Sequence, residues 1–267
     1  MAVIERALWT SASGMWAART QVDVIAHNLA NVNTPGYKAA RADFADLVYA
    51  AVRVPVAPAD AVEGVPVGHG VRVAATPRLW QQGPLLETGL PWDLAIDGPG
   101  FFRVADGDEI LYTRSGHFRL SPLPDGGTAV VDPGGRPLLL ADGRPLVLPQ
   151  GTREATVSPE GQVSVTLANG QQVVIGTIAL AWPATGDALE ARGDGLFAYT
   201  GAPGGLILVV PGAAGAGTIR QGMLEQANVS PADEMVRLLA AQRAYELNAR
   251  AIRTADEMMG LVNNLRA

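Results

Sequence analysis

Cysteine is absent from the 267 residues, which excludes disulfide scaffolds, cysteine nucleophiles and zinc sites built from thiolates. Histidine is scarce, and His27, His69 and His117 lack the i, i+4 spacing with which a helix presents two metal ligands. Long apolar runs are also missing, and the N-terminus lacks the apolar stretch of a cleaved signal peptide. We therefore expect no metal, no membrane insertion and no cleaved leader.

A concentration of basic residues is missing from the sequence as well. The chain has 20 Lys and Arg against 26 Asp and Glu, a net charge of −6. Residues 1–44 hold four basic and three acidic residues, and residues 233–267 hold five of each, so the negative excess lies in the middle. Binding to nucleic acid requires a concentration of positive charge, so nucleic acid is excluded as a main partner. Lys38 is the only lysine, and we interpret this preference for arginine as a trait of the coding sequence rather than of function.

Helix-breaking residues are missing from both ends of the chain. Of the 31 glycines and 19 prolines, all but Gly14 and Gly260 lie from Pro35 to Pro231. Because glycine and proline disfavour helix interiors, both ends are free to form long helices. We predict an α+β chain with four parts: an N-terminal helix over residues 1–34, an extended connector over 35–75, a β-rich middle domain over 76–225 and a C-terminal helix over 226–267.

Each predicted helix carries apolar residues at heptad spacing. These predicted seam residues are Leu8, Met15, Val22 and Ile25 in the first helix, and Leu238, Tyr245, Ile252 and Met259 in the second. Ser230 as N-cap and Pro231 at the first position predict where the second helix starts, and it should run to about Leu265. On periodicity alone the helices could cover their own domain's core. Their length instead favours a coiled-coil-like helical domain used for association.

The middle of the chain predicts short strands. Asp-Gly and Asn-Gly dipeptides, among them Asp106-Gly107 and Asn169-Gly170, separate short runs rich in valine, isoleucine and leucine. This pattern predicts an antiparallel sandwich or a barrel-like domain. Gly98-Pro99-Gly100 lacks the third glycine and the following helix of a dinucleotide-binding loop, and no catalytic motif is found. We therefore expect a protein that is not an enzyme and binds no cofactor.

Four segments together resemble the bacterial flagellar rod and hook (axial) protein family. The segment Asn28–Lys38 resembles the signature after the family's N-terminal helix, Leu94–Val104 its central element, Tyr112–Phe118 the segment that follows, and Gln242–Asn248 its C-terminal helix. The residues that carry the first two resemblances are Asn28, Leu29, Asn31, Thr34, Gly36, Tyr37 and Lys38, then Gly98, Gly100, Phe101 and Phe102. Thr34–Tyr37 also suits a type II turn, because Gly36 has no Cβ.

The resemblance implies a structural subunit of the flagellar basal-body rod. Such a subunit assembles into a hollow helical tube that transmits torque from the motor to the hook. The implied partners are copies of itself, other rod proteins, the hook protein, the surrounding ring proteins and the flagellar type III export apparatus. The implied location is the periplasm-spanning rod, reached without a cleaved signal peptide.

The position within the rod is expected to be distal. Chain length and the segments Arg41–Tyr49 and Gln221–Glu225 favour the distal rod, and a proximal rod position is the alternative. A secreted binding module with a coiled-coil stalk is a more distant alternative. It would form stable oligomers in dilute solution, whereas a rod subunit is expected to be a monomer with protease-sensitive ends.

Overall fold

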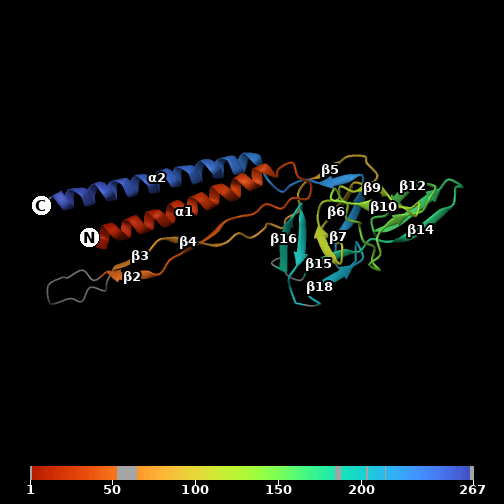
Figure 1. Cartoon of the computed structure of the whole chain (residues 1–267), viewed down its shortest axis with the longest axis horizontal. Coiled ribbons are helices and arrows are strands. Elements are labelled where there is room, and N and C mark those ends of the chain that lie inside the picture. The colour runs from red at the N-terminus through yellow and green to blue at the C-terminus, as the bar shows by residue number, and fades with distance from the viewer. Residues whose placement is uncertain (1, 53–64, 184–187, 203, 214, 265–267) are drawn as a thin grey trace. The chain divides into compact units, whose positions relative to one another are not determined.

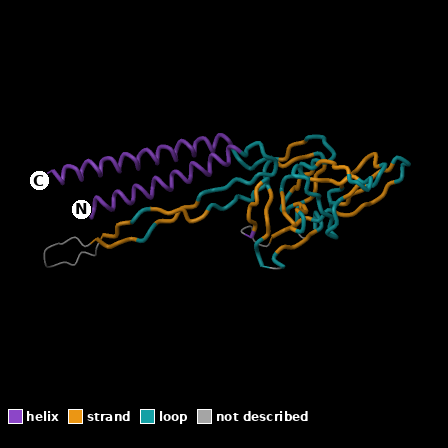
Figure 2. Tube along the Cα trace, viewed as in Figure 1, coloured by secondary structure: helices purple, strands orange, loops and turns teal. Residues whose placement is uncertain are grey.

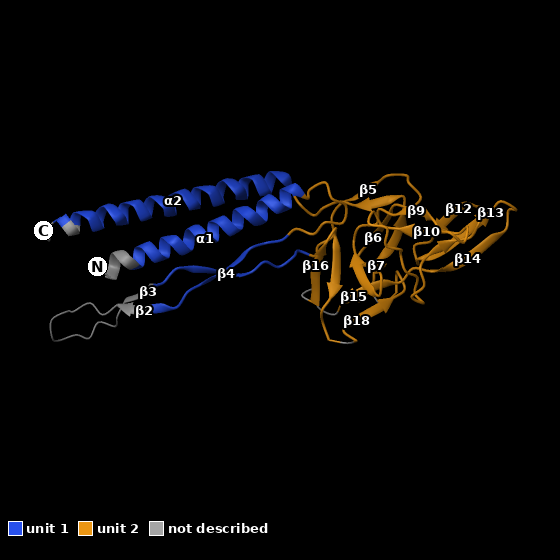
Figure 3. Ribbon diagram, in the orientation of Figure 1, with its two compact units in different colours: residues 1–30, 40–79, 230–267 blue, residues 31–39, 80–229 orange. Residues whose placement is uncertain are grey.

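The computed structural model describes residues 2–52, 65–183, 188–202, 204–213 and 215–264, and it divides into two compact units (Figure 3). Unit 1 comprises residues 1–30, 40–79 and 230–267, and unit 2 comprises residues 31–39 and 80–229. The predicted helix end near Leu265 and part of the predicted connector lie outside the described residues. The chain therefore passes from one unit to the other more than once.

Unit 1 is built on the two terminal helices, α1 (Ala2–Ala30) and α2 (Pro231–Asn264), which lie side by side (Figures 1 and 2). Its strands form two antiparallel ladders: β1 (Asp43–Asp46) with β4 (Val71–Ala75), and β2 (Tyr49–Val52) with β3 (Val65–Gly68). The sequence predicted an extended connector here. The structure shows that this extended chain pairs with itself.

The start of α2 agrees with its predicted capping. The Ser230 carbonyl accepts a hydrogen bond from the Glu234 amide at 3.0 Å, and the Ser230 hydroxyl oxygen lies 3.4 Å from the Asp233 amide nitrogen. Asp233 and Glu234 place negative charge in the first turn, where the helix dipole favours it. Pro231 occupies the first helical position, where it costs no hydrogen bond.

Most predicted seam residues are at least partly covered. Ile25 is buried, Tyr245 is exposed, and the remaining six (Leu8, Met15, Val22, Leu238, Ile252 and Met259) are half-buried. Ala241 and Ala255 are buried on α2, and Gly14 of α1 lies so close to Asn248 that a Cβ there would come within 2.8 Å of its Nδ2 atom. Small residues thus allow the helices to approach closely. The interlocking side-chain packing of a coiled coil stays a prediction.

Unit 2 is a set of small antiparallel sheets. A four-stranded sheet has the order β16 (Leu189–Gly193), β17 (Leu196–Tyr199), β8 (Glu109–Thr113), β7 (Phe102–Asp106). Two three-stranded sheets are β11 (Val147–Leu148), β10 (Thr128–Val131), β9 (Arg119–Pro122), and β12 (Thr152–Val157), β13 (Gln162–Leu167), β14 (Gln172–Thr177). Three further pairs are β5 (Leu85–Glu87) with β20 (Met223–Glu225), β6 (Leu94–Asp97) with β19 (Thr218–Gln221), and β15 (Leu180–Pro183) with β18 (Leu206–Val209).

These sheets confirm the α+β class with a β-rich, antiparallel middle. The described strands close no barrel, so the barrel-like version of the prediction is not what the structure shows. Phe101 and Phe102 explain part of the packing, because successive side chains of an extended chain point to opposite sides. Phe102 enters the main apolar core of unit 2, and Phe101 enters a smaller aromatic cluster with Tyr112 and Phe197.

Candidate functional site

A buried ion cluster in unit 2 joins three distant parts of the sequence. The Glu225 carboxylate accepts hydrogen bonds from Lys38 Nζ at 2.6 Å, from Arg114 Nε at 2.8 Å and from the Gly83 amide at 2.9 Å. Lys38 and Glu225 are each 1% exposed, and Arg114 is 4% exposed. The one lysine of the chain is therefore a buried structural cation, and its position has a physical role that the sequence interpretation missed.

The cluster contains two cations for one carboxylate, and backbone carbonyl groups balance the excess. Arg114 donates to the carbonyl oxygens of Gly98 at 2.8 Å and Gly100 at 2.7 Å, while Lys38 Nζ donates to that of Gln81 at 2.7 Å. Burial lowers the pKa values of Lys38 and of Arg114, and the nearby Glu225 charge opposes both shifts. Gly98 and Gly100 have φ angles of 113° and 135°, so glycine is what lets this loop turn its carbonyls toward Arg114.

Gly36 brings the N-terminal motif against this cluster. Its amide donates to the Glu225 carbonyl at 2.8 Å, and the Tyr37 amide closes the predicted turn on the Thr34 carbonyl at 3.2 Å. Gly36 has a φ angle of 70°, and a Cβ at this position would overlap the backbone of Arg114 and its neighbour Ser115. Both conformation and space therefore require glycine here.

Two asparagines hold the chain directly after Lys38. In unit 2, Asn228 Oδ1 accepts from the Ala39 amide at 2.7 Å and its Nδ2 donates to the Gln81 carbonyl at 3.0 Å. In unit 1, Asn28 accepts from the Ala40 amide and donates to the Ala40 carbonyl, each at 2.9 Å. Each side chain supplies hydrogen bonds to backbone groups that no helix or strand would satisfy here.

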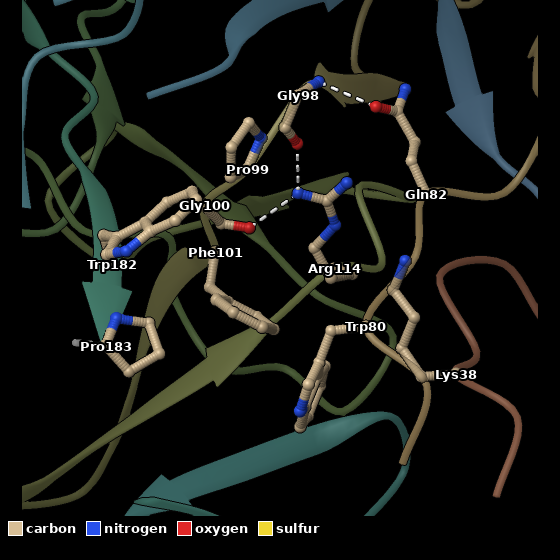
Figure 4. Close-up of a pocket in the computed structure, with 10 residues that line it drawn as sticks. All are labelled: Lys38, Trp80, Gln82, Gly98, Pro99, Gly100, Phe101, Arg114, Trp182 and Pro183. Atoms are coloured by element: carbon tan, nitrogen blue, oxygen red, sulfur yellow. Dashed lines mark hydrogen bonds between the residues drawn. The ribbon is translucent and has the colours of Figure 1, made fainter. Parts of the chain in front are cut away.

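A pocket of about 380 Å³ opens beside the ion cluster (Figure 4). Arg114 and Lys38 line one part, and the rings of Trp80, Phe101 and Trp182 line another. The Trp80 and Phe101 ring centroids lie 5.4 Å apart, with an interplanar angle of 82°. The pocket is therefore apolar on one side and cationic on the other.

The helix pair of unit 1 leaves large apolar side chains uncovered. Trp9 is 76% exposed and Trp16 is 72% exposed, and their spacing of seven residues places them on one face of α1. On α2 the exposed apolar side chains include Met235, Val236, Leu239, Leu247 and Leu261. Exposed apolar surface of this extent is typical of an interaction surface.

Two features are absent from the described residues. No helix among them has both the length and the apolar character needed to cross a membrane. Within the same residues, no group of three or more His, Asp or Glu side chains is arranged to hold a metal ion.

Comparisons with known proteins match the chain over nearly its whole length. The family described as flagella basal body rod protein matches residues 8–38, the flagellar hook protein FlgE/F/G D1 domain matches residues 95–165, and the flagellar basal body rod FlgEFG protein C-terminal family matches residues 220–265. The chain is 41% identical over 267 residues to the flagellar basal-body rod protein FlgG of Borreliella burgdorferi, covering 98% of each chain. The chain belongs to the flagellar basal-body rod protein family.

Other members of the rod family match over the same extent of the chain. The FlgG protein of Bacillus subtilis is 32% identical, with 98% of this chain and 99% of the relative covered. The FlgF protein of Caulobacter vibrioides is 33% identical, with 97% of this chain and 100% of the relative covered. The resemblance read from the motifs is therefore confirmed.

In this rod-family chain the structure distributes the predicted motif residues over several places. Gly36, Lys38, Gly98 and Gly100 meet around the ion cluster, as described. The Thr34 amide donates a hydrogen bond to the Asn31 carbonyl at 3.0 Å. Asn28 and Leu29 belong to unit 1, where Asn28 is buried and Leu29 is half-buried.

Sequence reasoning missed two central members of the cluster, Arg114 and Glu225. Both lie in segments with family resemblance, Tyr112–Phe118 and Gln221–Glu225. No local pattern showed that these two charges would be buried together, because they are far apart along the chain. A usable signal was the single lysine within a motif, since Lys38 had to meet an acid if it was buried.

Proposed function

We propose that this member of the flagellar basal-body rod family is a structural subunit of the distal rod. In this role the chain assembles with copies of itself into a hollow helical tube in the periplasm and transmits torque toward the hook. Its neighbours would be other rod proteins, the hook protein and the surrounding rings, and it would arrive through the flagellar type III export apparatus. Support comes from similarity to FlgG proteins along the whole chain.

The observation that carries the assembly part of this proposal is the exposed apolar face of the helix pair. Among the described residues of unit 1, the buried apolar side chains are few and mostly alanines: Ala17, Ala18, Ile25, Ala241 and Ala255. In contrast, Trp9 and Trp16 lie in solvent. A helix pair with so little core of its own gains stability when a neighbour covers it, so folding and assembly are coupled.

The ion cluster supports the part of the proposal that concerns the transmission of force. Residues 31–39 enter unit 2 and residues 225–229 leave it, and Glu225, Gly36 and Asn228 bind these two segments to each other. A force applied to either segment is therefore borne by buried, charge-assisted hydrogen bonds as well as by the covalent chain. This suits a subunit that transmits torque.

Replacement of Ile25 tests the assembly role. We expect Ile25→Asp to abolish rod assembly and swimming, because it places a charge in the buried contact of α1, while the β-strands of unit 2 stay folded. The matched control is Ala26→Asp, which adds the same charge at the neighbouring exposed position. Normal swimming by the Ile25→Asp strain would contradict the proposal.

Deletion of the gene tests the position in the rod. Electron microscopy of purified basal bodies should show a short rod without hook or outer rings if the position is distal. An absent rod would favour the proximal position, the alternative within the same family. Intact hooks would contradict both positions and favour the coiled-coil-stalked module, which also predicts stable oligomers by light scattering.

A further inference from the structure

Strand β18 of unit 2 is apolar and uncovered. Leu206–Val209 continues into Val210 as an unbroken aliphatic run, and Ile207, Leu208 and Val210 are exposed. One edge of β18 pairs with β15, and no described strand pairs with its other edge. Proteins usually protect such an edge with charged side chains, and β18 has none. A strand with a free edge and apolar side chains is suited to contact another polypeptide.

The aromatic pocket continues this apolar strand. Trp182 of β15 lies directly opposite Ile207 of β18 in the ladder, so their side chains share one face of the pair. Trp182 also lines the pocket of about 380 Å³ together with Trp80 and Phe101 (Figure 4). The pocket and this face of the strand therefore form one surface. We call it the β18 surface, defined by Trp80, Phe101, Trp182 and Ile207.

The distribution of charge indicates what covers the β18 surface. From Gly195 to Ile219 the sequence contains no Asp, Glu, Lys or Arg, although the whole chain has a net charge of −6. Identical chains repel each other over most of their surfaces and least where charge is absent. A partner of opposite charge would instead be matched by charged side chains, and this strand offers none.

We propose that the β18 surface is a contact with a second copy of this chain, made by unit 2 in addition to any contact made by the helices. This inference rests on the proposed function, because a rod subunit is surrounded by copies of itself. The contact is heterologous: the β18 surface of one copy meets a different surface of the next, so the array stays open and can extend as a helix.

A matched pair of substitutions tests the contact. Ile207 on β18 and Val174 on β14 are both aliphatic, both on edge strands of unit 2 and both 55% exposed. We expect Ile207→Arg to cause loss of rods and of swimming, and Val174→Arg to leave both intact. Circular dichroism and thermal unfolding of the purified full chains should show that both variants fold. Normal rods with Ile207→Arg would overturn the proposal.

Photo-crosslinking identifies the partner directly. Benzoylphenylalanine is placed at position 207, or at position 174 as the control, and whole cells and purified basal bodies are irradiated. We expect a product of two copies of the chain from position 207 and none from position 174. A product with a different protein, or no product, would overturn the proposal.

The same experiment separates this inference from the proposed function. Mass spectrometry of the basal bodies shows whether the chain is a rod component, whatever the crosslinking result. If the chain is present but position 207 gives no chain-to-chain product, the rod function stands and the β18 contact fails. If the chain is absent from basal bodies, the rod function fails, and the products in whole cells still decide the contact.

Discussion

Glu225 faces two buried cations, and this arrangement makes it the most sensitive side chain of the ion cluster. Glu225→Gln leaves Lys38 and Arg114 without a counter-charge, and removal of one partner from a buried ion pair costs about 3–5 kcal/mol. Lys38→Met should lower the free energy of unfolding by less, because Arg114 and Glu225 remain as an ion pair with no net charge. Urea unfolding of the full chain measures both free energies.

The control for Glu225 lies on the strand with which it pairs. Glu87 on β5 is exposed, so Glu87→Gln should change the free energy of unfolding by no more than about 0.5 kcal/mol. Equal effects of Glu225→Gln and Glu87→Gln would show that the buried cluster contributes nothing to stability. A larger loss with Lys38→Met than with Glu225→Gln would contradict the charge argument.

Gly36 allows the cost of close approach to be separated from the cost of backbone strain. Gly36→Ala should destabilise the chain by clearly more than the roughly 1–2 kcal/mol of a left-handed backbone alone, because the new Cβ overlaps the backbone of Arg114 and Ser115. Gly170 has a φ angle of 82° and open space around its Cβ position, so Gly170→Ala measures the strain alone. Thermal unfolding of both variants gives the comparison, and equal shifts would show that the contact at Gly36 relaxes.

At the scale of elements, the two faces of α1 have different roles. The face with Ile25 is covered within unit 1, whereas the face with Trp9 and Trp16 is open. Replacing both tryptophans by alanine should leave the free energy of unfolding of the monomer within about 0.5 kcal/mol, since both side chains are exposed. Rod assembly should nevertheless be lost.

The control for the tryptophans is on the same face. Asp23 is exposed and lies seven residues after Trp16, so Asp23→Ala alters the face without removing its aromatic groups. Basal bodies are counted by electron microscopy in each strain. Normal rods in the double tryptophan variant would mean that this face of α1 is not an assembly surface.

The sequence predicted the terminal helices well and one part of the strands poorly. Both helices followed from the absence of glycine and proline. This is a local property, and it favours a helix whatever the helix packs against. The pairing of β2 with β3 was missed, because a ladder depends on a partner distant in sequence and proline weakened the strand pattern. The same limit applied to the barrel-like prediction for unit 2.

At the scale of the whole molecule, the two units differ in how much apolar surface they bury. Unit 2 contains an extensive core that includes Phe102, Val104 and Leu111, whereas the described core of unit 1 is mostly alanine. In the monomer, amide hydrogens of α1 and α2 should exchange faster than those of β7 and β8. Hydrogen exchange measured by mass spectrometry tests this difference.

Assembly should reverse the pattern. In isolated rods we expect the helix amides to exchange slowly, because neighbouring copies cover the apolar faces. Helices that are as protected as β7 and β8 in the monomer would contradict the coupling of folding to assembly. Stable oligomers in dilute solution would contradict it as well.

The sequence by itself determined the helical ends, the β-rich middle and the family, because breaker residues, turn dipeptides and motifs are properties of short segments. Only the tertiary structure decided that Lys38, Arg114 and Glu225 form one buried cluster and that Trp182 and Ile207 share one face. Burial and cross-strand pairing bring together residues that no local spacing relates. Their energies depend on desolvation and on exact partners, which exist only in the folded chain.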